Sequence, residues 1–192
     1  MIVLILGILI FIGVHLVPTS PQARKGLAGQ LGEAQYKIAF SVASLIGFAL
    51  IIWGFGMARH SGANVQLWTP PTWTKHIAFA LMWPAFVLLV AAYVPSRIRD
   101  KAKHPMLAAI KVWALAHLLA NGDLAGLILF ASFLAWAVYD RISVKKRGAL
   151  GPLGAKHGGA TQDIIVVVVG TVAYLAMLFW GHAWLIGIRL VG

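Results

Sequence analysis

The sequence has no cysteine and only five acidic residues among 192. The absence of cysteine excludes disulfides, thiolate metal ligands and a cysteine nucleophile, so any metal must be bound by His, Met, Tyr or a carboxylate. Charged residues make up 11% of the chain and apolar residues 60%, whereas soluble domains carry about 25% charged residues. Because a chain of this composition could not cover its surface with polar groups in water, it is predicted to be a membrane protein.

Six apolar stretches are candidate transmembrane helices, since only a helix satisfies its own backbone hydrogen bonds in lipid. They are Ile2–Val17, Ile38–Ala58, His76–Val94, Met106–Ala120, Leu124–Tyr139 and Ile164–Ile188. The first, fourth and fifth are shorter than the roughly 20 residues of a full span. We interpret the first as a retained helix, because it lacks a basic segment before it and a clear cleavage site. The prediction is one all-α domain over residues 1–192, a polytopic bundle of about six spans.

The basic residues are sorted to one side of these spans. Twelve of the sixteen follow the first, third and fifth spans, and these are Arg24, Lys25, Lys37, Arg97, Arg99, Lys101, Lys103, Arg141, Lys145, Lys146, Arg147 and Lys156. Arg59, Lys75 and Arg189 lie on the other side, and Lys111 lies inside the fourth span. The positive-inside rule places the larger group in the cytoplasm and both termini outside. This predicts a multi-pass protein of a bacterial inner membrane.

The net charge of +11 has a simple explanation in this topology. Basic loops at the cytoplasmic face attract anionic lipid head groups, so nucleic acid is not expected as a partner. Residues Asn121, Gly122 and Asp123 form a turn signal that predicts a tight hairpin of the fourth and fifth spans, with Asp123 capping the fifth helix.

Small and aromatic residues add two expectations about packing. A stripe in the second span predicts close helix packing, and it contains Ser41, Ser44, Gly47 and Gly54. Seven tryptophans lie mostly near span ends, and an interfacial belt would explain most of them. They are Trp53, Trp68, Trp73, Trp83, Trp136, Trp180 and Trp184.

Histidines inside the spans are the main indication of chemistry. His15 lies in the first span, and His117 follows His104 by thirteen residues, about 20 Å along a helix. A titratable ring at that depth usually faces the bundle interior, where it either hydrogen-bonds a neighbouring helix or binds a cofactor. Two inward imidazoles can hold a haem iron from both faces, and axial ligation of haem b is the metal chemistry that this composition best permits. His104, which precedes Pro105, is either a helix-start residue or a reserve ligand.

Two residues of the fourth span accompany His117. Lys111 is the only full charge in the middle of a span, where insertion costs about 2.5–3.5 kcal/mol. It either extends back to the cytoplasmic head groups or acts as counter-ion for a buried anion, such as a haem propionate or a substrate carboxylate. Trp113 lies four residues before His117 and therefore on the same helix face.

Several stretches resemble the NnrU family of bacterial membrane proteins, over essentially the whole length of the chain. They are Gly13–His15, Leu67–Pro71, Ala91–Pro95, His104–Met106, Lys111–Gly122, Phe133–Ala137 and Asp140–Ser143. The family name implies a link to nitric oxide and nitrite reduction in denitrifiers, without defining an activity.

The family in turn resembles the plastid zeta-carotene isomerase. That enzyme looks like a haem b protein that isomerises a cis double bond in a polyene when its iron is reduced. This resemblance implies haem b in the present chain, with iron ligands at His15 and His117. In the isomerase a cysteine three residues before the second histidine can replace it as a ligand. The corresponding residue here is Ala114, so ligand switching is not expected. Depth alone would pair His15 with His104, which stays as the reserve.

Four classes of function are compatible with the family to different degrees. The first is a haem-binding protein of nitrogen-oxide metabolism or a redox-gated isomerase of a hydrophobic molecule. The second is an accessory or assembly factor for a respiratory complex, without a cofactor of its own. A transporter is less well supported, because the sequence shows no inverted repeat or pair of broken helices. A membrane methyltransferase would need cytoplasmic His, Arg and Glu motifs near the C-terminus that the chain does not contain.

Overall fold

Each apolar stretch forms a helix in the computed structural model, which describes residues 1–151 and 153–191. The last residue of the predicted domain, Gly192, lies outside the described residues. In chain order the elements are α1 (Ile2–Leu16), η1 (Val17–Thr19), α2 (Pro21–Leu31), α3 (Glu33–Arg59), α4 (Thr72–Ala91), α5 (Arg97–Ala102), α6 (Pro105–Ala120), α7 (Leu124–Arg147), α8 (Ala160–Ala176), η2 (Met177–Gly181) and α9 (His182–Ile186). Here η1 is a 3₁₀-helix and η2 a π-helical segment.

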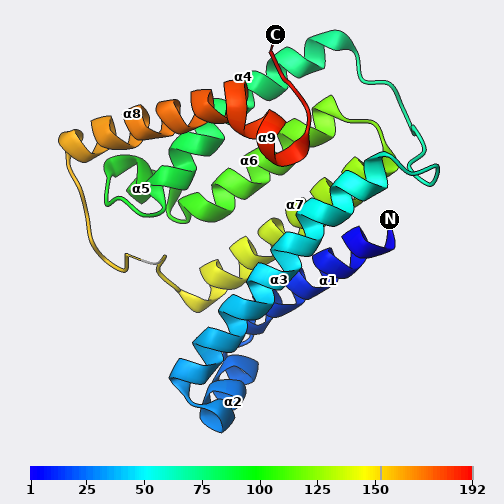
Figure 1. Cartoon of the computed structure of the whole chain (residues 1–192). Coiled ribbons are helices and arrows are strands. Elements are labelled where there is room, and N and C mark those ends of the chain that lie inside the picture. The colour runs from blue at the N-terminus through cyan, green and yellow to red at the C-terminus, as the bar shows by residue number, and fades with distance from the viewer. Residues whose placement is uncertain (152, 192) are drawn as a thin grey trace.

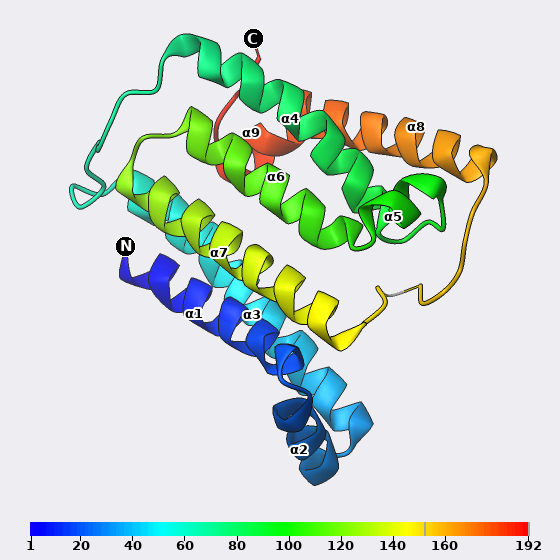
Figure 2. The same cartoon turned by 180° about the vertical axis from the view of Figure 1, so that it is seen from behind.

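The helices pack in a row in which α7 joins two groups (Figures 1 and 2). On one side α7 contacts α1, which packs along α3, and on the other side it contacts α6, which packs along α4. Helix α8 covers the far side of α4. Helices α1 and α6 both contact α7 but make no backbone contact with each other within the described residues. The row therefore places the two histidine-bearing helices on either side of α7.

The all-helical fold class is confirmed, and five segments are long and apolar enough to cross a membrane. These are Ile2–Thr19, Glu33–Arg59, Thr72–Ala91, Leu124–Arg147 and Ala160–Ile186. Helix α6 is apolar but shorter, as expected for the fourth span. The fifth was also expected to be short, and this was wrong, because α7 continues past Tyr139 to Arg147 and has 24 residues. The number of spans and the side on which the termini lie stay predictions.

The structure differs from the predicted spans at three places. The polar segments Pro21–Leu31 and Arg97–Ala102 form helices α2 and α5, which an apolar pattern does not indicate. The last stretch is not one continuous helix, because the π-helical η2 separates α8 from α9. Helix α2 begins with Pro21 at its first turn, and the Ser20 hydroxyl accepts a hydrogen bond from the Ala23 amide, which together favour a helix start.

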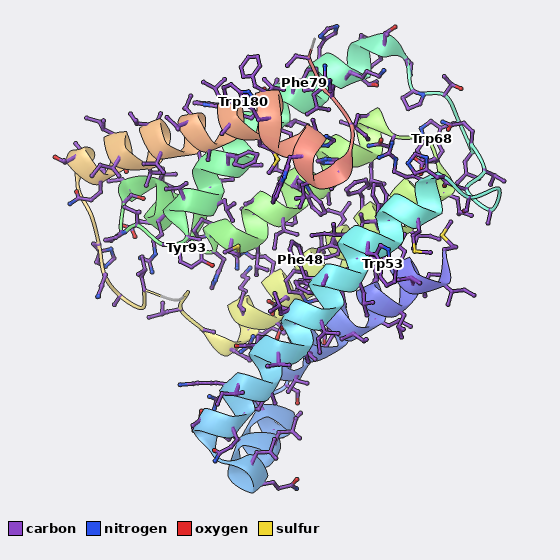
Figure 3. The ribbon with its side chains drawn as sticks, in the orientation of Figure 1. Phe48, Trp53, Trp68, Phe79, Tyr93 and Trp180 are labelled. Carbon is purple, nitrogen blue, oxygen red and sulfur yellow. The ribbon has the colours of Figure 1, made fainter. Side chains whose placement is uncertain are left out.

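Apolar side chains cover most of the outer surface of the bundle. Figure 3 shows Phe48, Trp53 and Trp180 on the outside of their helices, and the two tryptophans are 64% and 71% exposed. The outer face of α8 is similar, with Ile164, Val168 and Val172 exposed. Such a surface is stable in contact with lipid and not with water.

The predicted hairpin of the fourth and fifth spans is confirmed. Helix α6 ends at Ala120, and α7 begins at Leu124. The Asp123 carboxylate accepts a hydrogen bond of 2.9 Å from the Gly126 amide, as predicted for a cap. Gly122 accepts hydrogen bonds from the amides of Leu67 and Trp68, so the long α3–α4 connection is attached to this turn.

Candidate functional site

His15 lies at the end of α1, in an aromatic environment. Its Nδ1 donates a 2.7 Å hydrogen bond to the Phe11 carbonyl, one helical turn earlier. Its ring stacks on Phe11 with centroids 4.2 Å apart, and meets Phe40 of α3 and Trp136 of α7 edge-on at 5.0 and 5.4 Å. Because a carbonyl can only accept, Nδ1 carries the proton, and Nε2 of the neutral ring keeps its lone pair.

His117 has the same local arrangement near the end of α6. Its Nδ1 donates to the Trp113 carbonyl at 2.8 Å, and its ring stacks on Phe130 of α7 at 4.5 Å. Trp113 lies 5.2 Å from the His117 ring, which confirms that the two residues share a face. Both intramembrane histidines are thus held in the tautomer with a free Nε2, which is the form that binds a metal.

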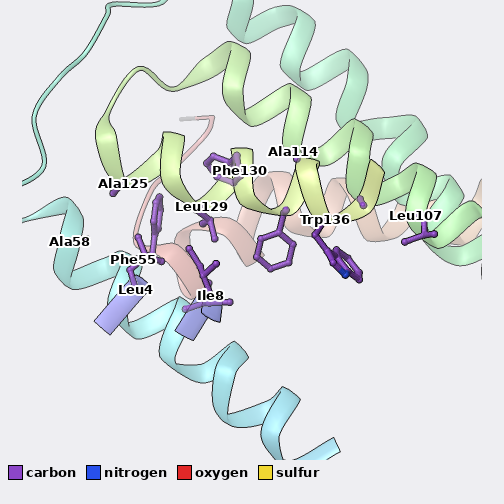
Figure 4. Close-up of a cluster of buried hydrophobic side chains, with 13 residues drawn as sticks. Leu4, Ile8, Phe55, Ala58, Leu107, Ala114, Ala125, Leu129, Phe130 and Trp136 are labelled. Atoms are coloured by element: carbon purple, nitrogen blue, oxygen red, sulfur yellow. The ribbon is translucent and has the colours of Figure 1, made fainter. Parts of the chain in front are cut away.

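A stripe of aromatic residues on α7 connects the surroundings of the two histidines. Phe130, Phe133 and Trp136 recur every three residues and are buried in one core cluster with Leu4 and Ile8 of α1 (Figure 4). Phe133 is 5.5 Å from Phe11 on the α1 side and 5.5 Å from Trp113 on the α6 side. Its ring is therefore located between the two histidine-bearing helices.

The two imidazoles do not meet in this packing. His15 contacts Trp136 and His117 contacts Phe130, and these α7 residues are six positions, or about 9 Å, apart along the helix. The rings of Phe11, Phe133 and Trp113 fill the space between the imidazoles. In the described part of the chain no group of three or more His, Cys, Asp or Glu residues could hold a metal ion.

The donor atoms nevertheless fit a haem iron, which two neutral imidazoles bind through Nε2. Trp136 is a second feature that fits a bound cofactor. Its indole N–H is buried without a hydrogen-bond partner in the described residues, and its ring contacts His15. A buried N–H of this kind is costly unless an acceptor pairs with it. A porphyrin between α1 and α6 would require Phe133 and its neighbouring rings to change position.

His104 lies at the same end of the bundle as His15. It is the residue before α6, and the Asp140 carboxylate is near enough to interact electrostatically with both His15 and His104. Burial lowers the pKa of His104, and the nearby Arg141 lowers it further, while Asp140 opposes the shift. The lowered pKa favours the neutral imidazole, which is the form that a reserve ligand needs.

Lys111 is half-buried on α6. No ion pair or hydrogen bond joins it to another residue of the described part of the chain. Its ammonium group is therefore available for lipid head groups or for a bound anion. Asp140, which pairs with Arg147 at 3.6 Å, is a carboxylate near His15 to which the sequence analysis gave no role at the site.

Trp136 is an exception to the interfacial belt that was predicted for most of the tryptophans. It is only 8% exposed and belongs to the core cluster, whereas Trp53 and Trp180 lie on the outside as predicted. Hydropathy gives the depth of a tryptophan but not the direction in which it points. The three-residue spacing of Phe130, Phe133 and Trp136 was the signal that could have identified the buried face.

Comparison with known proteins identifies a family and no individual relative. A family model described as NnrU protein matches residues 3–190. No curated protein and no solved structure matches the chain.

Proposed function

Because the chain belongs to the NnrU family, we propose that it is an integral membrane protein that binds haem b between α1 and α6, and that His15 and His117 would hold its iron. One observation carries this proposal. Both imidazoles give their Nδ1 proton to a carbonyl of their own helix, which leaves Nε2 free, and both project from helices that pack on α7.

A bound haem would supply a redox-active iron that can bind a small molecule or polarise a double bond. The protein side chains would hold and shield it. Phe11 and Phe130, which stack on the histidines, would fix the orientation of the imidazoles, and the aromatic core would exclude water. The Trp136 N–H would donate to a polar group of the bound molecule. Ala114 is completely buried and offers no alternative ligand.

The first experiment measures haem in the full chain purified in detergent after expression with sufficient haem supply. We expect a Soret band that shifts on reduction and a pyridine haemochrome of haem b. His15→Ala and His117→Ala should each lower haem content by at least about tenfold, since loss of even a supporting residue typically costs that much. His60→Ala and His76→Ala are matched controls, because both rings are exposed.

Three outcomes would contradict parts of this proposal. Stoichiometric haem in both the His15→Ala and the His117→Ala proteins would exclude these ligands. Loss of haem in His104→Ala but not in His117→Ala would show that the second iron ligand is His104 and not His117. A wild-type protein without haem that co-purifies with a respiratory complex would support the accessory-factor function, which the filled space between α1 and α6 favours.

We propose two reactions for a haem-loaded protein, nitrogen-oxide chemistry and isomerisation of a hydrophobic polyene. The reduced protein should bind nitric oxide with a change in its absorption spectrum in the first case. In the second case it should convert a cis-polyene to its trans isomer in mixed micelles, and oxidation should stop the conversion. Chromatography of the polyene distinguishes the two, because nitric oxide binding alone produces no isomer.

We also propose that the basic end of the bundle faces the cytoplasm of a bacterial inner membrane. The order of the helices brings α2, α5 and the end of α7 to this end (Figure 2). Because the chain contains no cysteine, single cysteines report the orientation directly. In intact spheroplasts a membrane-impermeant maleimide should label Gly62→Cys and not Lys101→Cys, both exposed positions. The reverse pattern would invert the orientation.

A further inference from the structure

Two small hollows lie on either side of the turn that joins α1 to α2. The first, about 180 Å³, is lined by Pro18, Arg24, Tyr36, Lys37, Phe40 and Ser41. The second, about 250 Å³, is lined by Thr19, Tyr139, Ile142, Ser143, Lys146 and Arg147. Each is larger than several water molecules at about 30 Å³ apiece, which is enough for a phosphate group. Both open to the surface at the basic end of the bundle.

The first hollow combines a fixed cation with a free one. Arg24 makes a two-point ion pair with Glu33 at 3.0 and 2.9 Å, and its guanidinium lies 5.5 Å from the centre of the Tyr36 ring. The exposed Lys37 has no ion pair or hydrogen bond to another residue in the described part. The Tyr36 hydroxyl is buried, again without a partner among the described residues.

The second hollow is similar, because it also contains one Lys, one Arg, one Tyr and one Ser. Its α7 residues are spaced as one helical stripe, and the Ser143 hydroxyl donates to the Thr19 carbonyl at 3.0 Å, which attaches α7 to the turn. Arg147 is held by Ser143 at 3.1 Å and by Asp140 at 3.6 Å. Lys146 is exposed and, within the described residues, makes no such contact. Each hollow thus contains one positioned guanidinium and one uncommitted ammonium.

The lining changes from apolar to cationic across each hollow. Phe40 and Ile142 lie toward the apolar part of their helices, and Lys37 and Lys146 lie toward the polar ends. The apolar stretch of α3 begins at Ile38, next to Lys37. The hollows therefore lie at the level where lipid phosphate meets hydrocarbon, provided that this end of the bundle is at the membrane surface.

We propose that these two hollows bind the phosphate groups of anionic phospholipids, with Lys37 and Lys146 as the principal cationic contacts. A free phosphate would satisfy the ammonium groups but not the apolar lining, whereas the glycerol and acyl chains of a lipid would cover Phe40 and Ile142. Basic residues near an anionic membrane surface each contribute appreciably to its attraction. This inference depends on the membrane placement of the bundle and not on haem.

The test titrates lipid into the full chain purified in a neutral detergent, with bound lipid counted by native mass spectrometry. Phosphatidylglycerol should bind the wild-type protein more tightly than phosphatidylcholine does. The double variant Lys37→Gln/Lys146→Gln should lose about thirtyfold in affinity for phosphatidylglycerol, or about 2 kcal/mol. The matched control Lys25→Gln/Lys145→Gln removes the same charge at the same end from residues that line neither hollow. Because charge interactions weaken with distance and are screened by salt, it should lose less than about threefold.

Two further samples make the result specific. Lys37→Arg/Lys146→Arg keeps the charge and should retain wild-type affinity, which excludes a general loss of structure. Inorganic phosphate added in excess should not displace the lipid. Equal losses in the two glutamine double variants would overturn the proposal, because they would show attraction to the whole basic end. Displacement of the lipid by inorganic phosphate would show that the hollows bind phosphate alone, and the proposal that they bind a lipid would then be wrong.

Discussion

Replacing Gly54 by valine is expected to cost about 3 kcal/mol or more in the free energy of unfolding. A Cβ atom at this position would overlap the Leu4 amide nitrogen and lie 2.7 Å from the Leu4 Cα. Both are backbone atoms of α1, which cannot move aside as a flexible side chain can. Overpacking of a close interface typically costs 1–3 kcal/mol, and here two whole helices must separate.

The contact at Gly54 is part of a continuous interface. Gly47 of α3 approaches the Phe11 amide, and Gly7 of α1 approaches the Ile51 amide, each at 2.7 Å from an added Cβ. In lipid there is no hydrophobic force between helices, so van der Waals contact of this kind stabilises their association. Separation of α1 from α3 would also remove Phe40 from His15.

The measurement is unfolding of the detergent-solubilised protein in increasing SDS, followed by tryptophan fluorescence. Gly56→Val is the matched control, since it lies two residues further along α3 and an added Cβ would meet nothing within 4 Å. It should unfold at the wild-type SDS fraction. If both valine variants shifted the midpoint equally, the effect would come from the backbone of α3 and not from its contact with α1.

The sequence was sufficient to predict this interface in part, because small residues in a transmembrane helix indicate close approach. It could not identify α1 as the partner, which depends on how the helices rotate about their axes. Because helix rotation does not follow from the sequence, the separation of the two histidine rings was not predicted either. Depth along a span follows from residue counting, so His15 and His104 were expected at one end. The rings that separate His15 from His117 were not predictable, because they come from three different helices.

The elements that sequence reasoning missed are those outside the apolar pattern. Helices α2 and α5 are polar and short, so hydropathy does not indicate them. Arg99 of α5 is the clearest example. In the sequence it is one of twelve basic residues that set the topology, whereas in the structure it is 6% exposed. Its burial depends on contacts with residues more than fifty positions later in the chain, which no local pattern contains.

Arg99→Ala is expected to release the connection between α7 and α8 and to destabilise the protein by about 3 kcal/mol. The Arg99 guanidinium donates to the carbonyls of Lys156 and Gly154, at 2.6 Å each. A hydrogen bond from a charged donor contributes about 1.5–3 kcal/mol, and its loss leaves the carbonyl without a protein partner. Arg99→Lys should recover only part of this, because an ammonium cannot reach two carbonyls with the fixed geometry of a guanidinium.

Limited trypsin digestion is a sensitive measurement of this release, because the carbonyl held by Arg99 belongs to the scissile Lys156–His157 bond. The Arg99→Ala protein should be cut there at least about tenfold faster than wild type, since local opening that costs even 1.4 kcal/mol less is tenfold more populated.

Arg97→Ala, an exposed position on the same helix, removes a neighbouring trypsin site and should leave the rate at Lys156 unchanged. Cleavage after the exposed Lys146 serves as the internal reference. Equal acceleration at Lys156 and Lys146 would indicate that the whole end of the bundle had opened, and Arg99 would then not be specific to this connection.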